Sequence, residues 1–221
     1  EAAPAPVAPC EADAVVDPGP ALPRRLSTVE YENTLRDLLG ADSETGVEFP
    51  PDEEMLGLDN NARALQVTPL HAERYMEQGE ALAPRIALVW AERVECILED
   101  PEDLDEDGCV DRFIDTLGLR AWRRPITAAE KTQLIGVYEI GKTTGEGSRM
   151  EGLSLVVEAL VQSPYFLFRV EVGTPDPMRA NLRLLTDYEF ATRLSYLIWR
   201  TMPDDALFEA VQTGELGTTE G

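Results

Sequence analysis

The chain has 221 residues, of which 43% are hydrophobic, so it can bury a sizeable core in one large or two small domains. It carries 42 acidic against 19 basic residues, and its formal net charge of -23 would repel nucleic-acid phosphates and anionic membrane surfaces, so we expect no nucleic-acid partner. No apolar run approaches the ~20 residues that cross a bilayer, so we expect no transmembrane segment.

Residues 1–23 are rich in proline and alanine, which predicts an extended arm with little helix. Cys10 lies in this arm. We expect it either to pair with another chain or another part of the same polypeptide, or to remain a free, exposed thiol. The start at Glu1 without Met indicates a mature or trimmed N-terminus, which fits a removed export signal.

Three helix starts share one pattern, in which a Ser or Thr is followed three positions later by Glu. The pairs are Ser27 with Glu30, Thr127 with Glu130, and Thr186 with Glu189. In such a capping box the hydroxyl accepts the N3 amide, while the carboxylate accepts the N-cap amide. The sequence therefore predicts helices that begin at residues 28, 128 and 187.

Apolar spacing predicts the elements of the first half. A helix ends at Gly40, and a long polar connection over 41–67 follows, which in a compact domain is typically functional or packed as an Ω-loop. Thr68, followed by proline, is a good N-cap for one long helix or two, and Pro84 marks the expected kink or break. Helix is expected to resume after Gly108.

In the second half, residues 150–161 are apolar over much of their surface, which is typical of a central helix. Residues 165–170 fit a short strand and a buried helical turn equally well. The last elements are a loop over 174–177, a helix over 186–200 and a helix from Pro203 to Val211. Because no βαβ alternation occurs, the fold class is mainly α: an irregular multi-helix bundle with long loops and a Pro-rich N-terminal arm.

We divide the chain into four parts on this basis. They are the arm over 1–23, an N-terminal helical region over 24–98, a central helical region over 99–172, and the start of a further helical domain over 173–221. The last part looks truncated or cleaved.

An acidic loop is the best metal candidate. Asp103, Asp105 and Asp107 stand at alternate positions before a glycine, and Asp111 follows at the ninth position, as in a calcium loop. An EF-hand would place a bidentate Glu at the twelfth position, where this chain has Ile114. Calcium and a solvated acidic turn both remain open.

Two cysteines, Cys96 and Cys109, flank this acidic loop. A disulfide between them would close it and stabilise the fold by roughly 3 kcal/mol in the chain-entropy model. We expect that bond. It implies an oxidising compartment, and therefore an extracytoplasmic location that is periplasmic, outer-surface or secreted.

Two arginine pairs, Arg24 with Arg25 and Arg123 with Arg124, precede helix starts, where the helix dipole disfavours cations. Bidentate pairing with Asp or Glu between helices is one explanation. A bound anion or an acidic cofactor group, such as a porphyrin propionate, is the other. His71 is the only histidine, which excludes a His-rich metal site within the chain, and its place in a first helical turn suits a neutral surface imidazole.

Five collinear segments resemble a known family. They are RRLSTVEYENTLRDLLG over 24–40, FPPD over 49–52, RAWRRPIT over 120–127, QSPYFLFRVE over 162–171, and LTDYEFATRLSYLIW over 185–199 with MPDD over 202–205. They are similar to a set of adjoining domains of unknown function in large exported proteins of planctomycetes and myxobacteria. The resemblance covers the N-terminal half of those proteins.

In that family the corresponding region is followed by helical domains that carry a Cys-x-x-Cys-His motif, and many members bear a cytochrome c domain. The resemblance implies extracytoplasmic electron transfer or oxidation by haem c carried outside this chain, which itself binds no haem covalently. Any enzyme would be an oxidoreductase whose haem site lies elsewhere. The expected partner is the C-terminal half of the same polypeptide or a second chain, linked through Cys10. The alternative is a calcium-stabilised extracytoplasmic binding or structural module without redox activity.

Overall fold

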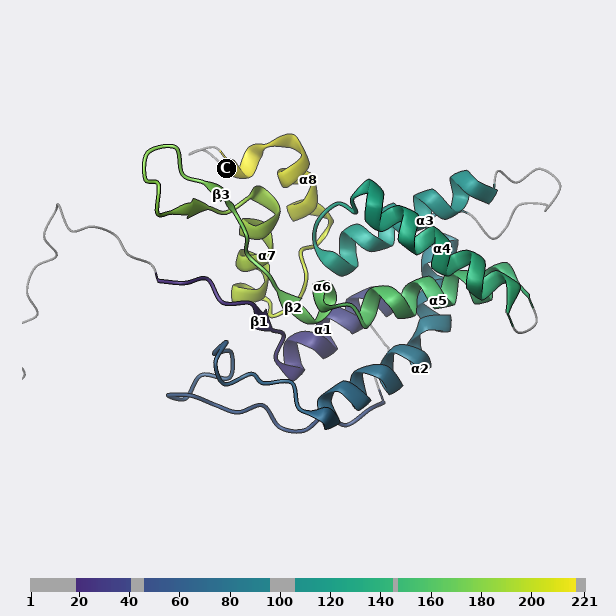
Figure 1. Ribbon diagram of the computed structural model, residues 1–221, viewed down its shortest axis with the longest axis horizontal. Coiled ribbons are helices and arrows are strands. Elements are labelled where there is room, and N and C mark those ends of the chain that lie inside the picture. The colour runs from purple at the N-terminus through teal and green to yellow at the C-terminus, as the bar shows by residue number, and fades with distance from the viewer. Residues whose placement is uncertain (1–18, 41–45, 96–105, 145–146, 218–221) are drawn as a thin grey trace, which may run out of the picture.

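A computed structural model describes residues 19–40, 46–95, 106–144 and 147–217. In these ranges the chain is mainly helical, which confirms the predicted class (Figure 1). The helices are α1 Thr28–Leu39, α2 Pro69–Arg93, α3 Glu106–Trp122, α4 Ala128–Thr143, α5 Arg149–Val161, α6 Pro164–Leu167, α7 Asp187–Ile198, α8 Asp205–Thr213 and the 3-10 turn η1 Glu215–Gly217. The strands are β1 Arg24–Arg25, β2 Phe168–Arg169, β3 Thr174–Pro175 and β4 Arg183–Leu184.

All three predicted capping boxes are present and start α1, α4 and α7 at the expected residues. At α1, for example, the Glu30 amide donates to Ser27 Oγ and the Ser27 amide donates to the Glu30 carboxylate at 2.9 Å. A further box, Ser148 with Glu151, starts α5 and follows the same spacing. Thr68 caps α2 as predicted.

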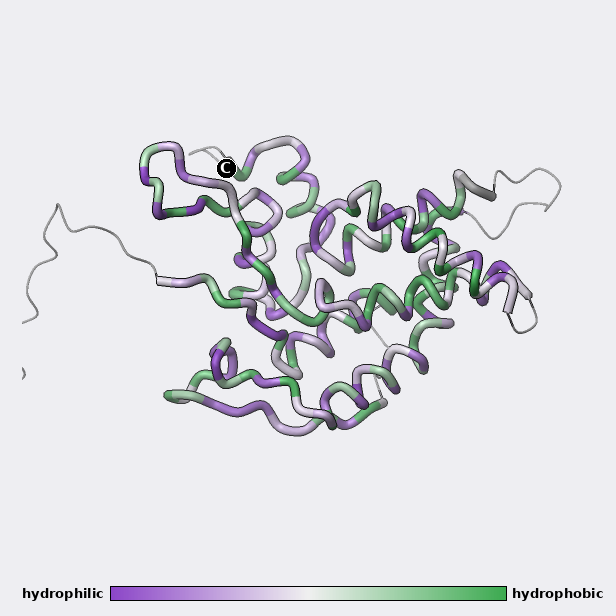
Figure 2. Tube along the Cα trace, viewed as in Figure 1, coloured by the Kyte–Doolittle hydropathy of each residue, from purple (hydrophilic) through white to green (hydrophobic). Residues whose placement is uncertain are grey.

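Helix α5 lies at the centre of the fold. The helix contacts α2, α3, α4 and α6, as the apolar sequence over 150–161 predicted for a central helix. Five of its large apolar residues are buried: Leu153, Val156, Val157, Leu160 and Val161. Figure 2 shows its trace as largely hydrophobic. A single cluster of buried side chains extends from Leu26 to Met202 and includes residues of α1 to α7.

Helix α2 runs unbroken through Pro84, which confirms one long helix, rather than two, of the predicted alternatives. Proline removes one backbone hydrogen bond and crowds the preceding turn. Buried side chains on both sides of it, Leu82 and Ile86, anchor the two halves of the helix to the same core. Tertiary packing thus outweighs the local cost.

The two short sheets show which structure residues 164–169 and 174–177 adopt. Residues 164–169 form both expected structures in succession, the turn of α6 and then β2, which pairs antiparallel with β1. The loop predicted over 174–177 is wrong in part, because it opens with β3, which pairs with β4. Asp176 stabilises the turn by accepting the amides of Met178 and Arg179 at 2.8 and 3.1 Å. Across the described ranges, no helix has the length and hydropathy of a membrane span.

A close approach of α4 to α5 generates a test of this core. A Cβ added at Gly141 would lie 2.9 Å from the backbone oxygen of Glu151, whereas one added at Gly136, on the same helix, would meet nothing within 4 Å. We expect Gly141→Ala to destabilise the fold by about 1–3 kcal/mol through overpacking. Gly136→Ala should stabilise it by about 0.5–1 kcal/mol through helix propensity. Urea unfolding measures the free energy of unfolding of each variant. Changes of the same sign in the two variants would contradict the packing described.

Candidate functional site

Three arginines are buried in this acidic protein, around the pairing of β1 with β2. The exposed fractions are 1% for Arg25, 3% for Arg123 and 8% for Arg169. A buried guanidinium is costly unless its N–H groups find acceptors, so its partners define what the residue does.

Arg25 of β1 pairs with a carboxylate, although its Nε has no hydrogen-bond partner. It donates to the Asp52 carboxylate at 2.6 Å, to the Leu26 carbonyl at 2.9 Å and to the Tyr75 hydroxyl at 3.0 Å. Asp52 also accepts the Thr28 amide at 2.6 Å. The Phe-Pro-Pro-Asp segment therefore ties the long connection to β1 and to the start of α1.

Arg123 pairs with carbonyl oxygens instead of the expected carboxylates. Its guanidinium donates to the backbone oxygens of Tyr165, Phe166 and Phe168 at 2.6, 3.1 and 3.0 Å, and to the Tyr196 hydroxyl at 3.4 Å. Two of these carbonyls belong to the single turn of α6, and the third belongs to the first residue of β2. Arg123 precedes the start of α4, where a cation is disfavoured, but its guanidinium binds the carbonyls of α6 and β2 instead.

The other two predicted arginines do meet carboxylates, in the helix that each one precedes. Arg124 binds Glu130 through two hydrogen bonds of 2.7 and 3.0 Å, and Arg24 lies 3.4 Å from Glu30 and 3.2 Å from the Asn60 carbonyl. The hydrogen bond from Arg124 lowers the pKa of Glu130 to about 2 against the opposing effect of burial.

Arg169 of β2 differs from all of these. Its buried Nε has no hydrogen-bond acceptor, as in Arg24 and Arg25, but within the described ranges its guanidinium also has no carboxylate partner. Its Cζ lies 5.1 Å from the centre of the Tyr196 ring. It lines a cleft of about 950 Å³ together with Arg24, Arg63, Arg183 and Arg193. We call this the arginine cleft.

The arginine cleft lies where three segments meet: residues 19–24 before α1, the connection around 55–63, and the segment 169–185 with its β3–β4 hairpin. Figure 1 shows the first of these running between the other two. Glu171 is the one carboxylate in its lining. The cleft is the candidate site, because it concentrates cations in a chain of strongly negative charge.

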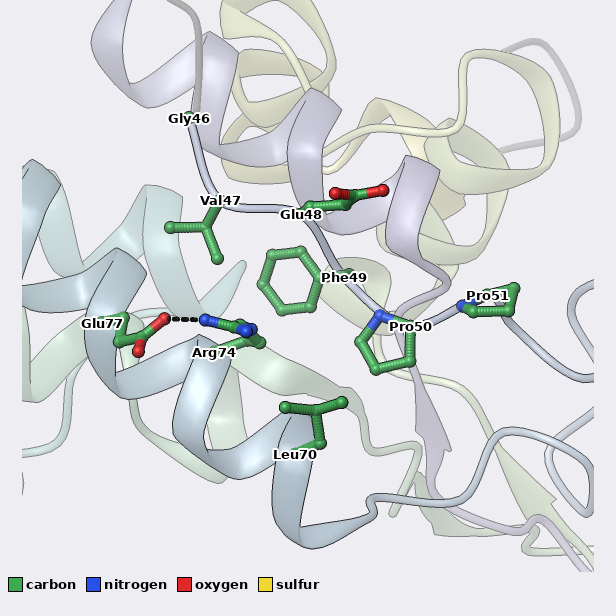
Figure 3. A pocket seen from close by; sticks show the side chains of 9 residues that line it. All are labelled: Gly46, Val47, Glu48, Phe49, Pro50, Pro51, Leu70, Arg74 and Glu77. Atoms are coloured by element: carbon green, nitrogen blue, oxygen red, sulfur yellow. Dashed lines mark hydrogen bonds and ion pairs between the residues drawn. The ribbon is translucent and has the colours of Figure 1, made fainter.

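A second cavity, of about 530 Å³, lies where the connection meets α2 (Figure 3). Phe49 and Pro50 line it with Leu70, and the exposed pair of Arg74 and Glu77 stands at its side. The Phe49 ring also packs edge-on against Tyr31 at 5.1 Å. This part of the Phe-Pro-Pro motif therefore anchors the connection to the core.

The cysteine prediction is accounted for in part. Cys109 is fully buried in α3 and disulfide-bonded. Its expected partner Cys96 lies outside the described residues, as does Cys10, so the pairing stays a prediction.

The calcium prediction is not tested. Asp103 and Asp105 lie outside the described residues, and α3 already begins at Glu106, before Asp107. Asp111 is part of that helix and faces Lys131 at 3.6 Å. In the described ranges no group of three or more His, Cys, Asp or Glu could hold a metal ion, and calcium binding remains a prediction.

His71 lies in the first turn of α2 as predicted, but it is buried, with 5% exposed, and not a surface group. Its Nδ1 accepts from Thr68, which completes an unusual capping box with histidine in the place of Glu. Burial, and then the charge of Arg25, lower its pKa, so the imidazole is neutral as expected.

Three family models match the chain in succession, each described as a protein of unknown function. DUF1587 matches residues 24–87, DUF1595 matches 109–171 and DUF1592 matches 185–221. No curated protein and no solved structure matches the chain. The chain therefore carries three adjacent domains of unknown function, as its motifs indicated.

The pairing of Glu130 with Arg124 predicts a pH dependence. Because the folded pKa is lowered from 4.5 to about 2, this carboxylate stabilises the fold fully above pH 4.5, and the contribution is lost as the pH falls towards 2. We expect Glu130→Gln to be less stable than the parent at pH 7, with the difference shrinking between pH 4.5 and 2. Glu139→Gln, at an exposed site on the same helix, is the control. Urea unfolding at several pH values measures the stability difference between Glu130→Gln and the parent. A difference that is constant with pH would contradict the pairing of Glu130 with Arg124.

Proposed function

We propose that this chain is the N-terminal helical part of an exported c-type-haem-associated redox protein, acting in electron transfer or an oxidase-like reaction. The haem is carried by a part outside this chain. The observation that carries the proposal is the succession of three domains, in the same order as the segments by which the sequence resembles the cytochrome-linked family.

An extracytoplasmic location is supported by the disulfide-bonded state of Cys109. Thiols are kept reduced in most cytosols, and a buried structural disulfide is typical of exported proteins. The location is part of the proposal, because the same bond fits the periplasm, the outer surface and the medium.

The C-terminal end of α7 is the surface that we assign to the haem-bearing part. Leu197 is 75% exposed, and Ile198 and Trp199 are 56% exposed. Contiguous exposed apolar side chains of this size typically mark a protein interface. Trp199 also lines a cavity of about 380 Å³, together with Arg93 and Arg120.

Two arginines and three carboxylates line the cavity beside this apolar surface; the carboxylates are Asp37, Asp204 and Asp205. Arg120 forms an ion pair with Asp205, and burial, and then the charge of Arg93, lower the pKa of Arg120. A haem edge is apolar, so the exposed apolar side chains at the end of α7 complement it. In this proposal the chain is a docking scaffold that orients the haem-bearing part.

The first test is the absorption spectrum of the native assembly, oxidised and dithionite-reduced. We expect a Soret band and sharp α and β bands on reduction in the material that copurifies with this chain. A colourless assembly that still contains the family's C-terminal domains would refute the redox proposal.

The docking surface is tested by Leu197→Asp in the same assembly, since a buried unpaired charge weakens an interface. Leu88→Asp, at a half-exposed site on α2, is the matched control. The expected result is loss of haem absorbance from the material purified on this chain in the first variant alone. Equal retention of haem in both variants would exclude this face.

A further inference from the structure

Arg169 sits in an arrangement that is unfavourable without a counter-ion. In the antiparallel register of β1 with β2 it stands directly opposite Arg24. Like charges at opposed positions of adjacent strands destabilise a sheet. Arg24 has Glu30 beside it at 3.4 Å, but Arg169 has no carboxylate among the described residues, although it is more than nine-tenths buried.

The other cations of the arginine cleft do not neutralise this charge. Arg193 pairs with Glu171, with one hydrogen bond of 3.0 Å, and also lies near Glu189. Arg183 donates to the carbonyls of Val172 and Gly173 at 2.5 and 2.8 Å, which satisfies its N–H groups but leaves its charge in place.

The cleft therefore holds an excess of positive charge. Five of the chain's 19 basic residues line it, and the carboxylates that face them are Glu30, Glu171 and Glu189. The excess is 5 − 3 = 2. Arg193 faces two of these carboxylates, whereas Arg63, Arg169 and Arg183 have no carboxylate partner within the described ranges; of these three, Arg63 is exposed at the rim.

The remaining lining fits a small molecule. The volume of about 950 Å³ lies within the range of ligand sites in proteins. Asn60, Asn61 and Asn181 supply polar groups, and Leu22 with Leu182 supplies apolar walls. Guanidinium groups bind carboxylate and phosphate oxygens in bidentate geometry, which makes arginine the typical residue for such ligands.

We propose that the arginine cleft binds a small ligand that carries at least two oxyanion groups, carboxylate or phosphate. One group binds Arg169 and Arg24 at the base, where it offsets the repulsion between them, and another reaches Arg63 at the rim. This site is independent of the haem proposal, because it lies around β1 and β2 and not on the exposed end of α7.

The test is calorimetric titration of the purified chain at low ionic strength with citrate and with inorganic phosphate, alongside thermal unfolding. Citrate should bind and raise the melting temperature, and phosphate, with one oxyanion group, should bind more weakly. Preferential binding of phosphate would instead assign a phosphate ligand to the base. Affinity should fall as salt is raised, because the attraction is electrostatic.

Arg169→Gln should weaken citrate binding at least tenfold and abolish the rise in melting temperature. Arg63→Gln changes an exposed residue at the rim and should weaken citrate binding several-fold. This variant keeps the proposal testable if Arg169→Gln does not fold. Arg74→Gln, from an exposed ion pair outside the cleft, is the control and should bind like the parent. Absence of binding to the parent chain, or equal binding by all variants, would overturn the proposal.

Discussion

The guanidinium of Arg123 is the interaction on which the rest of this structure depends. It collects backbone carbonyls from α6 and the start of β2, and it reaches the hydroxyl of Tyr196 in α7. Its own backbone has a φ of 56°, a conformation that costs energy for a residue other than glycine and is retained only where the surroundings fix it. By holding these carbonyls, one buried cation sets the direction in which the chain leaves α6.

That direction determines where the candidate site lies. Once β2 is fixed, β1 pairs with it, and the register places Arg24 opposite Arg169 while Arg25 turns to the other face, towards Asp52. The same short pairing thus produces one arginine that is neutralised and one that is not. A strongly acidic protein consequently has buried arginines where β1 pairs with β2, and the arginine cleft opens beside this pairing.

Much of the helical framework could be predicted from sequence, because its signals are local. Ser27, Thr127 and Thr186 each specify a helix start within four residues, and the apolar spacing of α5 specifies burial on most of its surface. The arrangement of Arg123, Arg24 and Arg169 around β1 and β2 could not be predicted in this way. The partners of Arg123 lie more than 40 residues along the chain, in a segment where strand and helical turn were equally favoured, and the opposition of Arg24 and Arg169 exists only after that segment has paired.

Hydrogen exchange on Arg123→Lys tests this account most directly. Lysine keeps the charge but cannot bridge several carbonyls with one planar group. If Arg123 organises the arrangement around β1 and β2, amide protection should fall at residues 166–169 and at Leu26, whose amide donates to Leu167, while α4 and α5 keep theirs. Protection at β1, α6 and β2 that matches the parent chain would contradict the central role assigned to Arg123.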